Sequence, residues 1–439
     1  DGLTSGGDIA DFIVRPLSEV RQEEREETLF MRAARGLVWC ASMKEASSTD
    51  EAAELLVNGF CVILFPKSGK ALGCEVKTGE KRSPSAPEAE NTVKGAKDAF
   101  TETLRTNTSL IRRHLRTPEL RLEESVVGRR SLTKITVCWV EGLTDPELPA
   151  RMKKRLGEID IDGLLSPAAV EEYVTGSRKT AFPLLEFTER TDHFCQGLLD
   201  GQVGLLVDGL PIGYLAPVSF GRLMRSPEDR ATDYLSASML RSLRYLALGV
   251  SLLLPGIYAA MAMFHQQMLP TKLLLSIIES KQDVPFSTLF EVVGLLCAFE
   301  LLQQAGLHLP QAIGTAVSII GGLVVGTAAV DAKLVSPAAL IVTASSGICG
   351  FTLPNRDLSD ALRLWRLGLT VLGGVFGLFG VTAGLLLLLI KLAGLESLGR
   401  SYLAPFGEAE VKGALVRERL TEQKWRDGTL RPLDERNQR

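Results

Sequence analysis

Long apolar runs in the second half of the chain constrain the fold most strongly. Residues 245–264 contain no charged side chain, and about 20 such residues are enough for one helix to cross a bilayer. Four further apolar stretches follow, at residues 289–305, 312–332, 334–353 and 367–390. Repeated runs of this length favour membrane-spanning helices over a single soluble helical core.

Glycine is frequent in two of these stretches, and this predicts close helix packing. Small residues let neighbouring backbones approach within a membrane, where burial of apolar side chains contributes little. We therefore expect a tight bundle and contacts between copies of the chain. The glycines concerned are Gly321, Gly322, Gly326, Gly373, Gly374, Gly377, Gly380 and Gly384.

The first 240 residues are polar and predict a soluble α/β region. The net charge of -3 argues against a nucleic-acid partner, which calls for a basic domain. The seven cysteines never form a CxxC pair, so we expect neither a disulfide framework nor a metal site, and a reducing compartment. No sequence motif indicates a cofactor.

A weak repeat with a spacing of about 140 residues divides the soluble region. DGLT at 1–4 is echoed by EGLT at 141–144, and LLVNG at 55–59 is echoed by LLDG at 198–201. Each copy predicts a helix followed by a strand hairpin, at 61–65 and at 203–207. The second copy has a preceding strand at 133–140, and we expect the first copy's equivalent to belong to a segment before residue 1.

These features predict five regions. They are a first α/β subdomain at 1–80, incomplete at its start; a basic helical connector at 81–131 with a long helix at 92–116; a second α/β subdomain at 132–240; a transmembrane helical domain at 241–395; and a basic tail at 396–439.

Basic residues predict the orientation of the membrane helices. Arg241 and Arg244 precede the first span, and the tail is dense in Arg and Lys, so both ends are expected on the cytoplasmic side. Residues 354–366, predicted to be a loop, favour the same side. Since five full crossings cannot place both ends on one side, we expect 289–305 or 367–390 to be re-entrant, interfacial or doubled back.

Ionisable residues in the apolar stretches are candidate functional groups. Glu300 either faces an ion path or ends a helix, because Gln303 and Gln304 follow it. For Asp331 and Lys333 we favour a mutual ion pair at a helix end. Glu291 lies in the same stretch as Glu300.

The stretch 334–353 is the predicted pore element, because it is uncharged and rich in hydroxyl groups. One helical stripe carries Ala339, Val342, Ser346, Cys349 and Leu353. Rings of Val or Leu gate pores by dewetting, and serine hydroxyls replace part of an ion's hydration shell. The stripe through Gly347 suits packing, and Pro337 permits a bend. A pore of this kind requires a homo-oligomer; alternatively, both stripes lie inside a bundle that contains no pore.

Enzyme motifs are absent, which predicts a protein that is not an enzyme. Asp192 and His193 lie near Cys195, but we expect a structural role for them. A small-anion carrier and a non-conducting scaffold are the alternatives to a channel.

Five long segments of the chain have a specific sequence pattern. The first, at 94–131, reads KGAKDAFTETLRTNTSLIRRHLRTPELRLEESVVGRRS; the others lie at 182–209, 243–260, 284–337 and 397–408. These segments resemble the A-subunit family of spore germination proteins, which comprises GerA-type germinant receptor A subunits and SpoVAF proteins. Receptor A subunits typically read close to EPETE and RGPREGFTE. This chain reads APEAE at 86–90 and VKGAKD at 93–98, which is closer to SpoVAF.

The resemblance implies a multi-pass protein of the endospore inner membrane that forms a ring-shaped ion channel in germination. It implies a membrane B subunit and a lipoprotein C subunit as partners for a receptor, or a small membrane partner for a SpoVAF-like protein.

Overall fold

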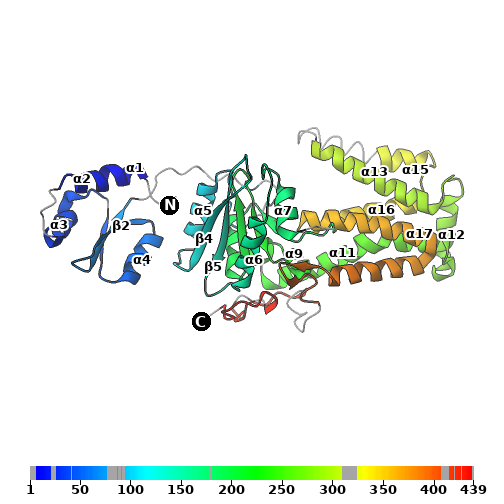
Figure 1. Ribbon diagram of the computed structural model, residues 1–439. Helices are drawn as coiled ribbons and strands as arrows, with labels where there is room; N and C mark the ends of the chain where they lie inside the picture. Colours follow the sequence, from blue (N-terminus) through cyan, green and yellow to red (C-terminus); the bar gives the residue numbers. More distant parts are fainter. Residues whose placement is uncertain are drawn as a thin grey trace.

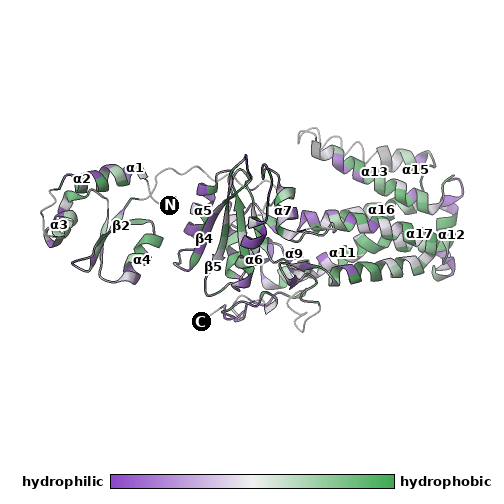
Figure 2. Ribbon diagram, viewed as in Figure 1, coloured by the Kyte–Doolittle hydropathy of each residue, from purple (hydrophilic) through white to green (hydrophobic). Residues whose placement is uncertain are grey.

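Two α/β domains are followed by a bundle of long helices (Figure 1). The computed structural model describes residues 6–20, 26–40, 42–76, 87, 90, 94–176, 180–308, 324–406, 415–419, 421–426 and 428–437. Hydrophobic residues dominate α11 and α17 of the bundle (Figure 2). The predicted fold class, an α/β region followed by a helical membrane bundle, is confirmed.

The first α/β domain is a three-stranded antiparallel sheet with the order β1-β3-β2. Its core contains Phe30, Phe65 and Leu72. The side chain of Ser48 accepts a hydrogen bond from the backbone N–H of Glu51 and begins α4. The elements are α1 (Gly6–Ile9), η1 (Ala10–Val14), α2 (Arg15–Ser18), α3 (Glu26–Arg32), η2 (Ala33–Leu37), β1 (Met43–Ala46), α4 (Thr49–Val57), β2 (Phe60–Phe65) and β3 (Lys70–Glu75).

The second α/β domain is a five-stranded antiparallel sheet with helices on both faces. The strand order is β4-β5-β7-β8-β6. Val203, Leu205 and Val207 of β7 pack with α6 and α7, whereas Leu206 packs with α5 and α8, as alternation along a strand requires. The elements are α5 (Leu104–His114), β4 (Leu120–Val127), β5 (Thr133–Val140), α6 (Glu147–Gly157), α7 (Pro167–Thr175), β6 (Glu186–Thr188), α8 (Thr191–Leu199), β7 (Val203–Val207) and β8 (Gly213–Ala216).

The two sheets contain the same unit. In the first, β1, α4, β2 and β3 form the order β1-β3-β2; in the second, β6, α8, β7 and β8 form the order β6-β8-β7. Gly59 and Gly201, each two residues after its helix, both have positive φ, 81° and 100°. The predicted repeat is therefore present in the topology. In the second unit β5 pairs with β7; β2 has no second partner strand among the described residues.

The predicted connector is wrong from residue 94 onward, because this part of the chain belongs to the second domain. Strand β4 pairs with β5 along its whole length, and α5 packs in the domain core through Leu104 and Ile111. The helix expected from residue 92 begins only at Leu104. Residues 94–103 contain no helix; Ala99 forms an isolated antiparallel bridge with Arg190, and Phe100 donates its N–H to the carbonyl of Glu189.

A short junction leads from the second domain into the helix bundle. Three of the bundle's described helices, α11, α13 and α17, are long and apolar enough to cross a membrane. The remaining elements are α9 (Phe220–Leu223), α10 (Glu228–Ala231), α11 (Tyr234–Met263), η3 (Gln266–Met268), α12 (Thr271–Lys281), α13 (Thr288–His308), η4 (Val324–Ala328), α15 (Ala329–Asp331), α16 (Pro337–Gly350), α17 (Arg356–Ala393), β9 (Glu396–Ser397), β10 (Arg400–Ser401) and η5 (Gly428–Leu430).

Helix α17 folds back on itself at Gly377, where φ is 64° and ψ is -151°. The Lys391 ammonium lies 5.9 Å from the ring centre of Trp365, although a straight helix would separate them by about 39 Å. Gly384 lies against Leu369. Residues 356–376 and 378–393 therefore form two antiparallel arms of roughly 31 Å and 24 Å.

The fold-back places both ends of α17 beside the second α/β domain. Leu358 in the first arm and Leu392 in the second share one core with Phe182 and Val218 of the domain. The turn at Gly377 lies against Phe264 and His265, beyond the other end of α11. Of the two segments named as candidates for doubling back, 289–305 and 367–390, the second contains the fold-back.

Other expectations for the bundle need correction. Residues 356–366 are the first turns of α17 and not a loop, because the Asn355 side chain caps this helix. Pro337 occupies the first turn of α16 without a bend, and Ser336 is its N-cap. Most of the stretch 312–332 lies outside the described residues.

The basic tail is also part of the folded structure. The hydroxyl of Ser397 donates to the carbonyl of Leu184, and Tyr402 is buried in the core shared with the second domain. Further along, Leu433 donates its N–H to the carbonyl of Leu143. The region that was expected to be a separate tail therefore covers the second domain.

Candidate functional site in the membrane helices

Four members of the predicted pore stripe lie on α16, which packs between α11 and α13, and the fifth, Leu353, follows its end. Ser346 is fully buried, and its hydroxyl donates to the carbonyl of Ser251 on α11 at 2.7 Å. Ala339 is also fully buried and packs with Val292 and Leu296 of α13. Within one protomer, these two members of the stripe face neighbouring helices.

The other three members of the stripe differ in exposure. Val342 and Cys349 are half-buried, whereas Leu353 is buried in the core beneath the second α/β domain. The outer side of α16 carries instead Ile341 and Ile348, each 65% exposed. The exposed side of α16 in one protomer is therefore apolar and lies beside the predicted stripe.

The stripe through Gly347 packs against a helix, as expected. A methyl group at Gly347 would lie 2.8 Å from Cζ of Phe299 on α13. The rings of Phe299 and Phe351 are 5.8 Å apart between centroids. Gly347 thus provides the space that an aromatic side chain of α13 fills.

Glu300 is paired with arginines of α17. One carboxylate oxygen lies 2.6 Å from Nη2 of Arg366, and the other lies 3.4 Å from Nη1 of Arg363. The Arg366 side chain is only 4% exposed. Sequence reasoning placed these arginines in a loop and so missed the pair; their helical i, i+3 spacing was the available signal.

Glu291 links three elements at the end of the bundle remote from the α/β domains. It accepts hydrogen bonds from the N–H and the hydroxyl of Ser336, at 3.0 and 2.8 Å. Its other oxygen lies 3.0 Å from the ammonium of Lys281 on α12. Glu291 therefore holds the beginning of α16 against α12 and α13.

The expected Asp331–Lys333 pair is wrong. Lys333 instead forms an ion pair with Asp283, which lies between α12 and α13. The backbone of Lys333 has positive φ, 56°, so the chain turns at this residue and directs it away from its neighbour in sequence.

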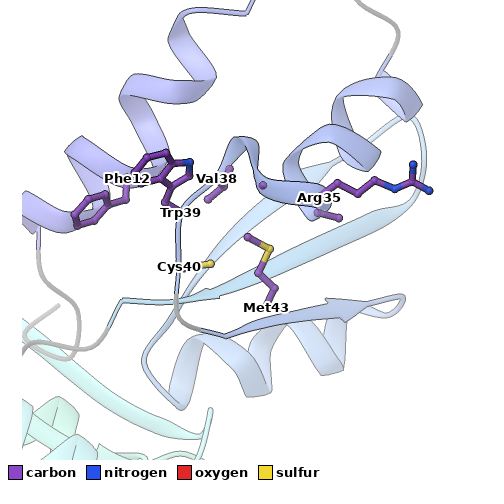
Figure 3. Close-up of a pocket in the computed structure, with 8 residues that line it drawn as sticks. Phe12, Arg35, Val38, Trp39, Cys40 and Met43 are labelled. Carbon is purple, nitrogen blue, oxygen red and sulfur yellow. The ribbon is translucent and has the colours of Figure 1, made fainter.

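Two places in the soluble domains are candidates for a catalytic site, the residues around Cys195 and a hollow in the first domain. In the described part of the chain, neither brings together a nucleophile and a base. Burial raises the pKa of Cys195 to about 12, with Asp192 acting in the same direction, and His193 contacts Glu186 at 3.1 Å. In the first domain, a hollow of about 760 Å³ has Arg35 as its single charged lining residue among those described. Figure 3 shows the Arg35 side chain directed away from the sulfur atoms of Cys40 and Met43.

Comparison with known proteins places these helices in a family. The family described as "Bacillus/Clostridium GerA spore germination protein" matches residues 1–429. "Spore germination protein KA" of Bacillus subtilis is 34% identical over 420 residues, which is 95% of this chain and 77% of that protein. "Uncharacterized membrane protein YfkQ" of the same organism is also 34% identical, over 95% of this chain and 82% of that protein.

Two further comparisons extend these matches. "Spore germination protein XA" of Bacillus anthracis is 33% identical, over 90% of this chain and 80% of that protein. The crystal structure of the N-terminal domain of the A subunit of the Bacillus megaterium germinant receptor GerK3 aligns at 25% identity with a TM-score of 0.35, over 49% of this chain and 79% of that one. The match along nearly the whole length shows that the chain belongs to the GerA family of spore germination proteins.

Proposed function

We propose that this protein is a membrane subunit of the endospore germination machinery and that its copies form a ring that conducts cations. It lies in the spore inner membrane as a multi-pass protein, with both ends on the side of the spore core. Its partners are a membrane B-type subunit and a C-type lipoprotein, or a small membrane partner of the SpoVAF type.

The placement of α16 is the main support for a channel. The helix spans 14 residues, about 21 Å, and is thus shorter than the roughly 30 Å of a hydrocarbon core. Hydroxyl groups at both Ser336 and Ser346 are bonded inside the bundle. A short apolar helix that carries hydroxyl groups between longer helices suits an ion path, because such groups can replace part of an ion's hydration shell.

Val342 is half-buried, and it is the proposed constriction of the path. It borders the apolar outer side of α16, so copies arranged around an axis bring several Val342 side chains together. For Ser346 to face the ion path, its hydroxyl must release the carbonyl of Ser251. A rotation of α16 about its own axis, relative to α11, would break this hydrogen bond. This movement is the proposed gating step.

Cation leak from proteoliposomes tests the proposal. Val342→Ala removes apolar bulk from the constriction, and we expect the resting leak to rise because the dewetting barrier falls. Val371→Ala, on the exposed side of α17, is the matched control and should leave the leak unchanged. A native mass of one protomer, or equal leak in both variants with the ring intact, would contradict a pore along α16.

The alternatives predict other outcomes of the same measurement. Saturable flux of small anions without cation leak would indicate a carrier, and no flux from intact rings would indicate a scaffold. If cations pass but Val342 has no influence, α13 with Glu300 becomes the leading pore element.

A further inference from the structure

A cavity of about 300 Å³ lies where the second α/β domain meets the first membrane helix. Its walls come from α8, α9, α10, the start of α11, β6 and residues 94–95. Among the described lining residues, three carry carboxylates, Glu186, Asp192 and Asp229. Six carry positive charge: Lys94, Arg190, Arg222, Arg225, Arg230 and Arg241.

The carboxylates of this cavity already have basic partners. Asp192 is 2.6 Å from Arg190, and Glu186 is 3.2 Å from Arg222. Asp229 forms ion pairs with two arginines of α11, Arg241 at 3.4 Å and Arg244 at 2.8 Å. One carboxylate is thus shared between two guanidinium groups.

Basic side chains at the cavity favour the ionised forms of two acids, Glu186 and Asp200. Burial alone would raise the pKa of Glu186, but His193 and Arg222 hold it at about 2. Asp200, next to the cavity, lies 3.1 Å from Arg222 and 3.2 Å from Arg230. Burial opposes its ionisation, yet these two arginines lower its pKa.

His193 provides an independent sign of a ligand. Its Nε2 lies 3.1 Å from a Glu186 oxygen. Its Nδ1 is buried and has no hydrogen-bond partner among the described residues, although buried polar atoms normally have one. Since His193 lines the cavity, a ligand there could complete its hydrogen bonding.

We propose that this cavity binds a phosphate group, either of free phosphate or of a lipid headgroup. Several guanidinium groups around one small space suit phosphate oxygens, to which arginine donates paired hydrogen bonds. The volume lies at the lower end of the range for ligand sites. A phosphate here would bridge Arg190 of the soluble domain and Arg241 of α11, and would tie the domain to the first membrane helix. The site extends beyond the proposed channel activity and does not depend on it.

Thermal unfolding of the full-length protein in detergent tests the site. Inorganic phosphate is titrated against chloride at constant ionic strength, and we expect a saturable rise of the unfolding midpoint. Arg230→Gln is a suitable variant, because the Arg230 side chain is 46% exposed and its partner Asp200 retains Arg222. Loss of one charge-assisted contact should weaken the apparent affinity about tenfold.

Lys94→Gln provides a second variant that involves no residue of the domain core, and Arg129→Gln is the control. Arg129 is an exposed arginine of the same domain and lies outside the lining of the cavity. We expect Lys94→Gln to weaken phosphate binding and Arg129→Gln to leave it unchanged. If Arg230→Gln fails to fold, Lys94→Gln decides.

Dihexanoyl phosphatidylglycerol, added below its micelle-forming concentration, distinguishes the two sources of phosphate. Competition with inorganic phosphate would assign the site to a headgroup, and absence of competition would assign it to the free ion; both outcomes support the proposal. An unfolding midpoint that rises with phosphate without saturating would overturn the proposal. Equal apparent affinities for phosphate in Lys94→Gln and Arg129→Gln would overturn it as well.

Discussion

Gly377→Ala tests the fold-back of α17, on which the arrangement of the bundle depends. Gly377 has φ of 64° and ψ of -151°, a region that residues with a Cβ atom rarely adopt. Occupying such a region costs about 1–3 kcal/mol. The added methyl group would also lie 2.7 Å from Cε1 of His265 and 3.3 Å from Cβ of Phe264.

We expect Gly377→Ala to raise the free energy of the folded hairpin by about 2–3 kcal/mol. The imidazole ring can move aside, whereas the backbone strain cannot be relieved. An increase of this size corresponds to a loss of roughly 30- to 150-fold in the population of the folded hairpin relative to alternatives. Gly368→Ala is the matched control. It lies in the same helix with nothing within 4 Å of its added methyl group, and should be neutral or stabilising, since alanine favours helix.

Thermal unfolding in detergent and labelling of introduced cysteines measure the effect. In the parent protein, cysteines at Arg356 and Lys391 should be labelled from the same side of the membrane, because both ends of α17 lie beside the α/β domain. Gly377→Ala should lower the unfolding midpoint, and Gly368→Ala should not. Labelling of the two positions from opposite sides, or equal midpoints for the two variants, would refute the fold-back.

Two further predictions concern ion pairs. Glu186 has a folded pKa of about 2, below its ordinary value of 4.5. Its pairing therefore contributes about 3 kcal/mol to the free energy of unfolding above pH 5, and this contribution is lost as the pH falls toward 2. Glu186→Gln should therefore lower the unfolding midpoint at pH 7 and have little effect near pH 2. Glu300→Gln should destabilise the bundle by about 2 kcal/mol, measured by the same unfolding assay, because it leaves the buried Arg366 without its carboxylate; partial exposure of Glu300 reduces the penalty expected for a fully buried pair.

Exposed glutamates provide the controls for both variants. Glu141→Gln in the second domain and Glu279→Gln on α12 should leave the midpoint nearly unchanged. An equal loss for Glu186→Gln at both pH values would contradict the pKa argument. For the bundle, Arg366→Met added to Glu300→Gln should restore part of the stability; a further loss would show that the pair does not act as a unit.

Local patterns determined much of the soluble region and the position of the membrane helices. Uncharged apolar runs marked α11 and α17, because helix length and bilayer thickness are matched irrespective of the neighbouring helices. Short apolar runs followed by turn glycines marked the hairpins β2–β3 and β7–β8. The repeat was visible because both copies require glycine at the same turn, Gly59 and Gly201.

Only the tertiary structure decided how these elements meet. The sequence of residues 367–390 allowed either a crossing or a fold-back, and contacts of Gly377 with His265 and of Trp365 with Lys391 select the latter. The Glu300–Arg366 pair and the arginine-lined cavity join residues that are far apart along the chain. Periodicity reports which face of one helix is apolar, but the neighbour of that face is set by packing over long sequence distances, so Ser346 proved to be bonded inside the protomer.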